Sequence, residues 1–168
     1  MFLDESGTTT NLTRRCGRAA RGCRVYDAMP QGHWCVRTLL SSVRADGTTA
    51  CMSVDSATDG DVFLVYVREV LVPTLRAGDI VILDNLSVHK HTEAIALMKG
   101  AGATVEYLPP YSPDLNPIEK MWSKIKEFLR AAKARTSRTL HAAITAAFRT
   151  ISAADVRSWF AACGYSIS

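Results

Sequence analysis

The sequence feature that most constrains the fold is a short apolar run, Ile80-Val81-Ile82-Leu83, which ends abruptly in Asp84-Asn85. Four consecutive apolar residues without alternation are typical of a strand that is covered on both faces, as in the parallel part of an α/β sheet. An acid directly after such a strand lies at the carboxyl edge of the sheet, where α/β domains place their ligand sites. The run therefore predicts a central strand with a polar site at its end.

Other strands and turns are predicted around this run. Four further strands are expected over residues 1–5, 33–43, 48–54 and 104–108. The first ends in Ser6-Gly7, which is a turn signal, and Ala45-Asp46-Gly47 is a strong hairpin signal because Asp and Gly tolerate positive φ. The first third is thus expected to be an antiparallel meander, and the whole chain an α/β domain with a mixed sheet.

Helical periodicity covers most of the remaining sequence. Helices are expected over 59–75 (ending near Pro73), 91–99, from Asn116-Pro117 to Leu129, over 140–151, and from Ser152 onward. Asn116 suits the N-cap and Pro117 the first helical position, while Ser152-x-x-Asp155 is a capping-type start. Ile118, Met121 and Trp122 begin an apolar stripe that should pack against the sheet.

Length and composition favour one globular domain over residues 1–168, since 48% of the residues are apolar and no internal repeat is visible. No run of 18 apolar residues exists, and acids stand near the start where a signal peptide carries basic residues, so we expect a cytoplasmic protein. Five cysteines without a Cys-x-x-Cys pair argue against a disulfide framework or structural zinc. The net charge of +4 permits a nucleic-acid partner.

Three acids stand where a metal site could form. Asp4 ends the first predicted strand, Asp84 ends the central one, and Glu119 lies in the first turn of the helix after the proline-rich loop. If the two strands are parallel neighbours, about 4.8 Å apart, both aspartates emerge at one edge and could share a hard divalent cation. Each acid also has a structural interpretation: a turn residue at Asp4, a solvated loop at Asp84, and a capping residue at Glu119 that bonds back to Asn116.

Three sequence blocks resemble one family. FLDES, ILDNLSVHK and LPPYSPDLNPIEKMWSKIK, in this order, are similar to the catalytic domain of DDE transposases, in particular to the bacterial insertion-sequence branch of the mariner superfamily. The resemblance extends over essentially the whole chain. Thirty-four residues separate Asp84 from Glu119, which is the spacing of the last two acids in that family.

The resemblance implies a function and its residues. It implies an RNase H-like five-stranded mixed sheet flanked by helices, with the first and fourth strands adjacent. It also implies that Asp4, Asp84 and Glu119 are the ligands of two Mg²⁺ or Mn²⁺ ions. Such a site would cleave DNA strands and transfer them into a target, which in this family is a TA dinucleotide. Asn85, His89 and Asn116 are expected to support the site, and His89 could contact a DNA phosphate, orient a metal-bound group, or simply begin a helix.

The DNA partner would need cations near the site. Candidates are Arg14, Arg15, Lys120, Lys124, Lys126 and Arg130. Phosphate neutralisation by such groups is sequence-independent and salt-sensitive, although a charged helix face can also be merely solvated.

Two functions remain open from the sequence. The family carries an N-terminal helix-turn-helix region, whereas only Met1-Phe2-Leu3 precede Asp4. We therefore expect weak DNA binding without end specificity, and self-association or pairing with an N-terminal DNA-binding part. The alternative to a catalytic domain is a truncated, non-catalytic remnant that only associates with DNA or a full-length transposase. A receiver-type domain using Asp84 is disfavoured because the opening hairpin does not suit an all-parallel sheet.

Overall fold

The computed structural model describes residues 1–166, which form a central five-stranded sheet in the order β3-β2-β1-β4-β5. Its strands are β1 (Phe2–Thr9), β2 (Val36–Val43), β3 (Thr49–Val54), β4 (Ile80–Leu83) and β5 (Thr104–Tyr107). The first three strands pair as an antiparallel meander, whereas β1 with β4 and β4 with β5 are parallel. The expected mixed sheet, with its first and fourth strands side by side, is confirmed.

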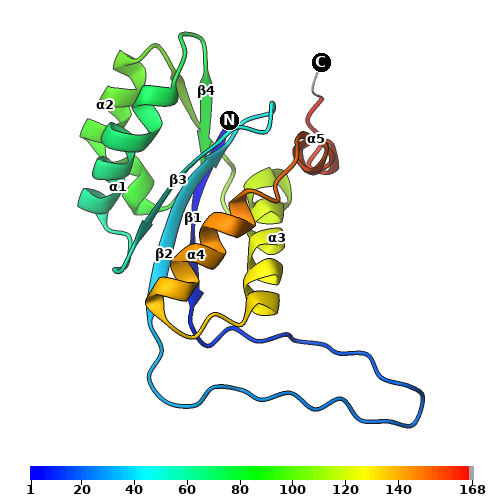
Figure 1. Cartoon of the computed structure of the whole chain (residues 1–168). Helices are drawn as coiled ribbons and strands as arrows, with labels where there is room; N and C mark the ends of the chain where they lie inside the picture. Colours follow the sequence, from blue (N-terminus) through cyan, green and yellow to red (C-terminus); the bar gives the residue numbers. More distant parts are fainter. Residues whose placement is uncertain (167–168) are drawn as a thin grey trace.

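Helices cover both faces of the sheet (Figure 1). On one side lie α1 (Gly60–Tyr66) and α2 (Thr92–Gly100), and on the other α3 (Pro117–Ala132), α4 (Ser137–Phe148) and α5 (Ala153–Ala162). Val81 and Leu83 of β4 are fully buried in the core beneath α1 and α2, while Ile82 packs against the opposite core. The apolar run is therefore covered on both faces, as its composition predicts.

Several local predictions are confirmed. Gly47 has φ +94°, and the Arg44 N–H donates to the Thr48 carbonyl across the hairpin. The Ser152 hydroxyl accepts from the Asp155 N–H at 3.1 Å, which completes the start of α5. Trp122 is 2% exposed within the core formed by α3, α4 and α5. No helix within residues 1–166 combines the length and apolarity needed to cross a membrane.

The predicted end of the first strand at Ser6-Gly7 is wrong. β1 runs on to Thr9, so Asp4 lies inside the strand rather than at its end. All eight residues of β1 pair with β2, including Gly7 opposite Thr38. A continuous partner strand thus outweighs the local preference of Ser-Gly for a turn.

The segment 59–75 is less regular than its periodicity suggests. α1 ends at Tyr66 and continues as a π-helical segment, Val67–Leu71, and a 3₁₀ turn, Val72–Thr74. Pro73 lacks the N–H that a longer α-helix would need, which accounts for the end of the segment there. The buried face is nevertheless continuous, since Phe63, Val67 and Leu71 are all fully buried.

Residues 10–35 contain no helix or strand and project from one end of the sheet (Figure 1). We call this segment the arm. Its two ends meet, since the Thr10 N–H donates to the Cys35 carbonyl at 3.1 Å and the Cys35 N–H to the Thr10 hydroxyl at 3.0 Å. Arg135, after α3, donates to two carbonyls at the beginning of the arm, and Lys133 pairs with Asp27 at 2.6 Å. The five cysteines are free thiols, and three of them lie exposed on the arm.

Candidate active site

The parallel pairing of β1 with β4 positions the two predicted aspartates. Phe2 is in register with Ile82, so two residues further along each strand Asp4 stands beside Asp84. Glu119 comes from the first turn of α3, which packs on the Phe2 side of the sheet. Three distant segments of the sequence therefore meet at the carboxyl end of β4.

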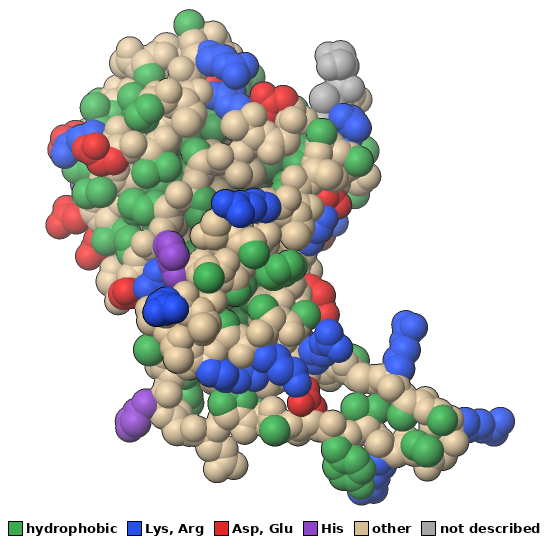
Figure 2. Space-filling model, in the orientation of Figure 1, with side chains coloured by type: hydrophobic (Ala, Val, Ile, Leu, Met, Phe, Trp, Pro, Cys, Tyr) green, Lys and Arg blue, Asp and Glu red, His purple; other side chains and the backbone are tan. Residues whose placement is uncertain are grey.

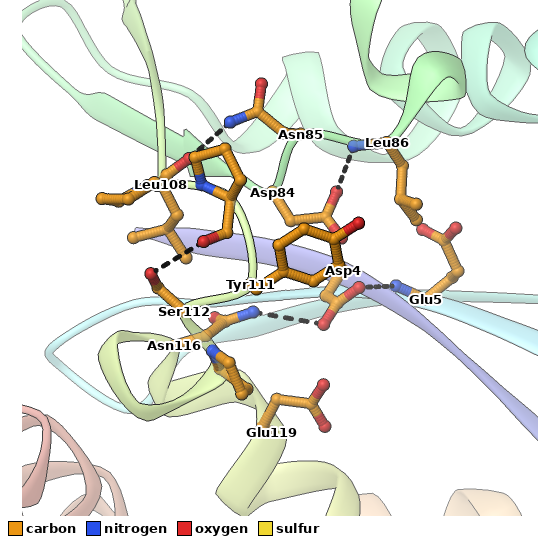
Figure 3. A pocket seen from close by; sticks show the side chains of 13 residues that line it. Asp4, Glu5, Asp84, Asn85, Leu86, Leu108, Tyr111, Ser112, Asn116 and Glu119 are labelled. Atoms are coloured by element: carbon orange, nitrogen blue, oxygen red, sulfur yellow. Dashed lines mark hydrogen bonds between the residues drawn. The ribbon is translucent and has the colours of Figure 1, made fainter.

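Asp4, Asp84 and Glu119 line one cleft of about 560 Å³ (Figure 3). Asn85 and Asn116, two of the predicted supporting residues, also line it, together with the proline-rich loop after β5. Asn85 donates from Nδ2 to the Leu108 carbonyl at 2.6 Å and so ties the start of that loop to the end of β4. Neither Lys nor Arg is among the residues that line the cleft.

His89, the third predicted supporting residue, lies behind the cleft and is fully buried. Its Nδ1 is 2.5 Å from Asp84 Oδ1 and its Nε2 is 2.8 Å from Glu5 Oε2. The Leu86 N–H also donates to Asp84 Oδ1, at 3.0 Å. The interpretation of His89 as a direct DNA-phosphate contact is wrong, because the side chain has no exposed surface; it holds Asp84 instead.

The hydrogen bond between His89 and Asp84 favours the charged form of both side chains. Burial opposes a charge on His89, but the hydrogen bonds and negative charges of Asp84 and Glu5 outweigh it and raise the pKa of His89 to about 9. Burial likewise opposes ionisation of Asp84, yet the His89 and Leu86 hydrogen bonds and the His89 charge lower its pKa overall. Near neutral pH His89 is therefore an imidazolium that bonds to Asp84 and Glu5, with Asp84 ionised.

Asn116 stands at the N-cap position of α3, but its side chain does not cap the helix. Its Nδ2 donates to Asp4 Oδ2 at 3.2 Å, while Asp4 Oδ1 accepts from the Glu5 N–H at 2.8 Å. The alternative interpretation of Glu119 as a capping residue is wrong, because the Asn116 N–H donates to the Pro113 carbonyl at 3.0 Å instead. The Glu119 carboxylate makes no hydrogen bond with any residue of the range 1–166 and is left beside the cleft.

Asp4 is the carboxyl group with the most unusual environment. It is 6% exposed, and burial, together with the charges of Glu119, Glu5 and Asp84, raises its pKa to about 7, although the Glu5 N–H bond acts in the opposite direction. The fold thus collects carboxylates around Asp4 without supplying a lysine or arginine to balance them. A site with this deficit favours binding of an external cation.

The donor set fits a hard divalent cation. Carboxylate and amide oxygens are the ligands that Mg²⁺ and Mn²⁺ prefer, and Asn116 Oδ1 is buried with no hydrogen-bond partner. Within residues 1–166, however, no three His, Cys, Asp or Glu side chains form a group already arranged around one ion. The carboxylates surround a space, with Asp4 between Asp84 and Glu119 (Figure 3), and do not form a closed cage.

The basic residues predicted to bind DNA differ in how accessible their charge is. Arg14 and Arg15 are exposed on the arm, where other arginine side chains also lie (Figure 2), and Lys120 is exposed on α3. Lys124 instead pairs with Asp155 at 2.6 Å, and Arg130 pairs with Glu127 at 3.5 Å. Lys126 is partly buried on α3. The arm therefore offers the more accessible positive charge.

Glu5 is the residue of the site that sequence reasoning missed. Successive residues of a strand point to opposite faces, so Asp4 faces α3 while Glu5 faces the side of α1 and α2, where His89 lies. Asp4 and Glu5 are adjacent in FLDES, and the alternation of a strand indicates that they have different roles. The role of Glu5 is evident only once the structure places His89 beside it.

Comparisons with known proteins identify the family and the fold. Residues 1–141 match the family model described as DDE superfamily endonuclease. The Mos1 strand transfer complex has a similar fold, with a TM-score of 0.70 at 15% identity over 96% of this chain and 50% of that chain. The Mos1 transposase paired-end complex with the left transposon end is similar too, with a TM-score of 0.69 at 13% identity. That match covers 96% of this chain and 51% of that chain.

These structural matches confirm the RNase H-like fold, and the chain spans about half the length of the Mos1 chains. A comparison with curated proteins finds no match.

Proposed function

This chain belongs to the DDE superfamily of endonucleases, and from that premise we propose that it is the catalytic domain of a transposase, formed by residues 1–168. It would cleave DNA strands at the ends of an insertion sequence and join them to a target, with a TA target as the family resemblance implies. The observation that carries the proposal is the convergence of Asp4, Asp84 and Glu119 on one cleft without a lysine or arginine. The structural similarity to transposase–DNA complexes supports DNA as the partner.

The three carboxylates would act as metal ligands. Asp4, with Asp84 on one side and Glu119 on the other, would hold two Mg²⁺ or Mn²⁺ ions. When bound, such ions activate the attacking oxygen and stabilise the leaving oxygen in phosphoryl transfer. The bound charge would also allow Asp4 to ionise at neutral pH despite its raised pKa.

The neighbouring residues would keep this arrangement in place. His89 holds one oxygen of Asp84, so that the other oxygen remains for a ligand. Asn116 fixes the rotamer of Asp4 through a hydrogen bond from the start of the helix that also carries Glu119. Partners outside the ligand shell typically change metal affinity or activity 10- to 100-fold, so both are expected to act as positioning residues.

DNA would be held mainly by the arm and by Lys120, while self-association or pairing with an N-terminal DNA-binding part would supply recognition of the element ends. Contacts between such basic side chains and phosphates carry no sequence information. We therefore expect salt-sensitive binding of this chain to any duplex.

A nicking assay on supercoiled plasmid DNA tests the proposal. The protein should convert supercoiled to nicked circles only with Mg²⁺ or Mn²⁺, and Asp84→Asn should abolish this conversion. Asp79→Asn is the matched control, because Asp79 lies at the opposite end of the same strand. Equal nicking by the wild type and Asp84→Asn would reject the proposed site.

Metal binding gives a second readout that does not depend on activity. A ligand that binds only the folded state raises the melting temperature with its concentration. Mn²⁺ should therefore raise the melting temperature of the wild type and of Asp79→Asn, but not of Asp84→Asn. Metal binding without nicking would favour the alternative of a non-catalytic remnant.

A further inference from the structure

Tyr111 is an aromatic side chain that the fold leaves entirely uncovered at the cleft. Its relative exposure is 103%, whereas Phe63, Tyr66 and Trp122 are at most 2% exposed. Tyr111 nevertheless lines the same cleft as Asp4, Asp84 and Glu119 (Figure 3). Its hydroxyl makes no hydrogen bond with a residue in the described range 1–166. No contact among residues 1–166 therefore accounts for an aromatic residue at this point.

The backbone of Tyr111 is in a strained conformation. Its φ is +55°, in the left-handed region that few residues other than glycine adopt, and among residues 1–166 only Lys133 is another non-glycine with positive φ. Strained residues persist where their surroundings impose the conformation, and they cluster at functional sites.

The loop around Tyr111 imposes that conformation without help from the ring. Pro110 precedes it and Pro113 follows closely, and proline fixes its own φ. The Ser112 hydroxyl donates to the Pro110 carbonyl at 3.3 Å, and further along the loop the Tyr165 hydroxyl donates to the Leu115 carbonyl at 2.8 Å. The loop thus places Tyr111 at the rim of the cleft and leaves the surface of its ring free.

The chemistry of the cleft indicates what this ring would contact. The carboxylates, and the divalent ions that they would bind, can contact only the phosphate and sugar oxygens of a DNA strand. No lysine or arginine lines the cleft to contact another part of the DNA. An exposed aromatic ring stacks on a nucleobase of any sequence, because every base has a π-face. A base can reach such a ring only when it is unstacked from its own duplex.

We propose that Tyr111 is a stacking surface for a nucleobase that adjoins the reacting phosphodiester. The DNA strand would then be bound through a base as well as through its phosphate. This inference rests on the proposed function, since it takes DNA as the substrate. The contact discriminates between unstacked and stacked bases and is tolerant of base identity. It therefore selects strand ends or locally opened duplex.

The test is binding of a single-stranded oligonucleotide of about 12 nucleotides, a length within the usual site sizes, that carries one 2-aminopurine, in the presence of Ca²⁺. Stacking on an aromatic ring quenches 2-aminopurine fluorescence. Tyr111→Phe and Tyr111→Trp should retain affinity and quenching, whereas Tyr111→Leu should lose the quenching and weaken binding about 5- to 150-fold, the range that corresponds to loss of one base–aromatic stack.

Tyr26→Leu is the matched control, because Tyr26 is also highly exposed, at 84%, but lies on the arm away from the cleft. It should leave the quenching unchanged. Equal affinity and quenching for Tyr111→Leu and Tyr26→Leu would overturn the proposal, as would loss of binding in Tyr111→Phe, since that result would assign the contact to the hydroxyl.

Two further measurements separate the possible failures. Tyr111→Gly should keep its melting temperature, since the ring contacts nothing and glycine accepts φ +55°; a clear drop would show that Tyr111 has a structural role and overturn the proposal. Plasmid nicking reports on the proposed function alone. Nicking that is lost in Asp84→Asn, together with no effect of Tyr111→Leu on the oligonucleotide, would reject the stacking contact and leave the transposase proposal standing.

Discussion

Two carboxylates near opposite ends of β4, Asp79 just before the strand and Asp4 on the neighbouring β1, lie in opposite electrostatic environments. Asp79, just before the strand, receives two hydrogen bonds from the nearly buried Arg44 and one from the Arg76 N–H, and the Arg44 hydrogen bond is the main reason that the pKa of Asp79 is lowered to about 2. Asp4, at the other end, lies among carboxylates, and its pKa is raised to about 7. The chain thus supplies a cation for Asp79, whereas it supplies none for Asp4, whose charge would be balanced by a bound ion.

The comparison predicts its largest effect for Asp4→Asn. Without this ligand the ions lose several kcal/mol of transition-state stabilisation, so metal-dependent nicking should fall about 10³-fold or more. Because the fold gains nothing from the Asp4 charge, the melting temperature of the metal-free protein should not fall. Normal nicking by Asp4→Asn would show that Asp4 is not a metal ligand. Unfolding of the variant would show that Asp4, like Asp79, stabilises the fold.

His89→Gln should have the next largest effect, because it loosens Asp84 while leaving all three proposed ligands in place. We expect a 10- to 100-fold loss of nicking, as for other groups that orient metal ligands. The measurement is the nicking rate as a function of Mn²⁺ concentration, and higher Mn²⁺ should restore part of the rate. A uniform loss at every Mn²⁺ concentration would argue against a positioning role for His89.

Asp79→Asn should show the reverse behaviour of Asp4→Asn. Breaking the pair leaves Arg44, which is 9% exposed, without its carboxylate, and should lower the free energy of unfolding by about 2 kcal/mol. Denaturant unfolding measures this change. The nicking rate per folded molecule should stay at the wild-type value, and a variant with reduced nicking but full stability would contradict the assignment.

The pH dependence of stability should show the smallest effect. The folded-state pKa of Asp79, about 2, lies below its ordinary value of 3.8, so its contribution is complete above pH 3.8 and is lost as the pH falls toward 2. Between pH 5 and pH 2 the wild type should therefore lose about 1–2 kcal/mol more than Asp79→Asn. Parallel pH profiles of the two proteins would show that the ion pair does not stabilise the fold.

Features set by burial and local periodicity could be predicted from the sequence. The apolar run of β4, the hairpin at Gly47 and the apolar stripe of α3 each depend on neighbouring residues alone. The meeting of Asp4 with Asp84 followed from the expectation that their strands are parallel neighbours.

Features that depend on distant partners could not be predicted. The continuation of β1 past Gly7 requires the whole of β2, and the side chain of Asn116 leaves its helix for Asp4, 112 residues away. Glu5 and His89 are 84 residues apart, and neither shows its role without the other. Local preference is a poor guide wherever a buried carboxylate offers a stronger hydrogen bond than the nearest backbone group.

The closed neck of the arm has a consequence for how this protein can vary. Since Thr10 and Cys35 already bond to each other, residues 11–34 could be replaced by a tight turn that would make β1 and β2 an ordinary hairpin. Insertions or deletions there would change the length of the arm, while the sheet, Asp4 and Asp84 keep their positions.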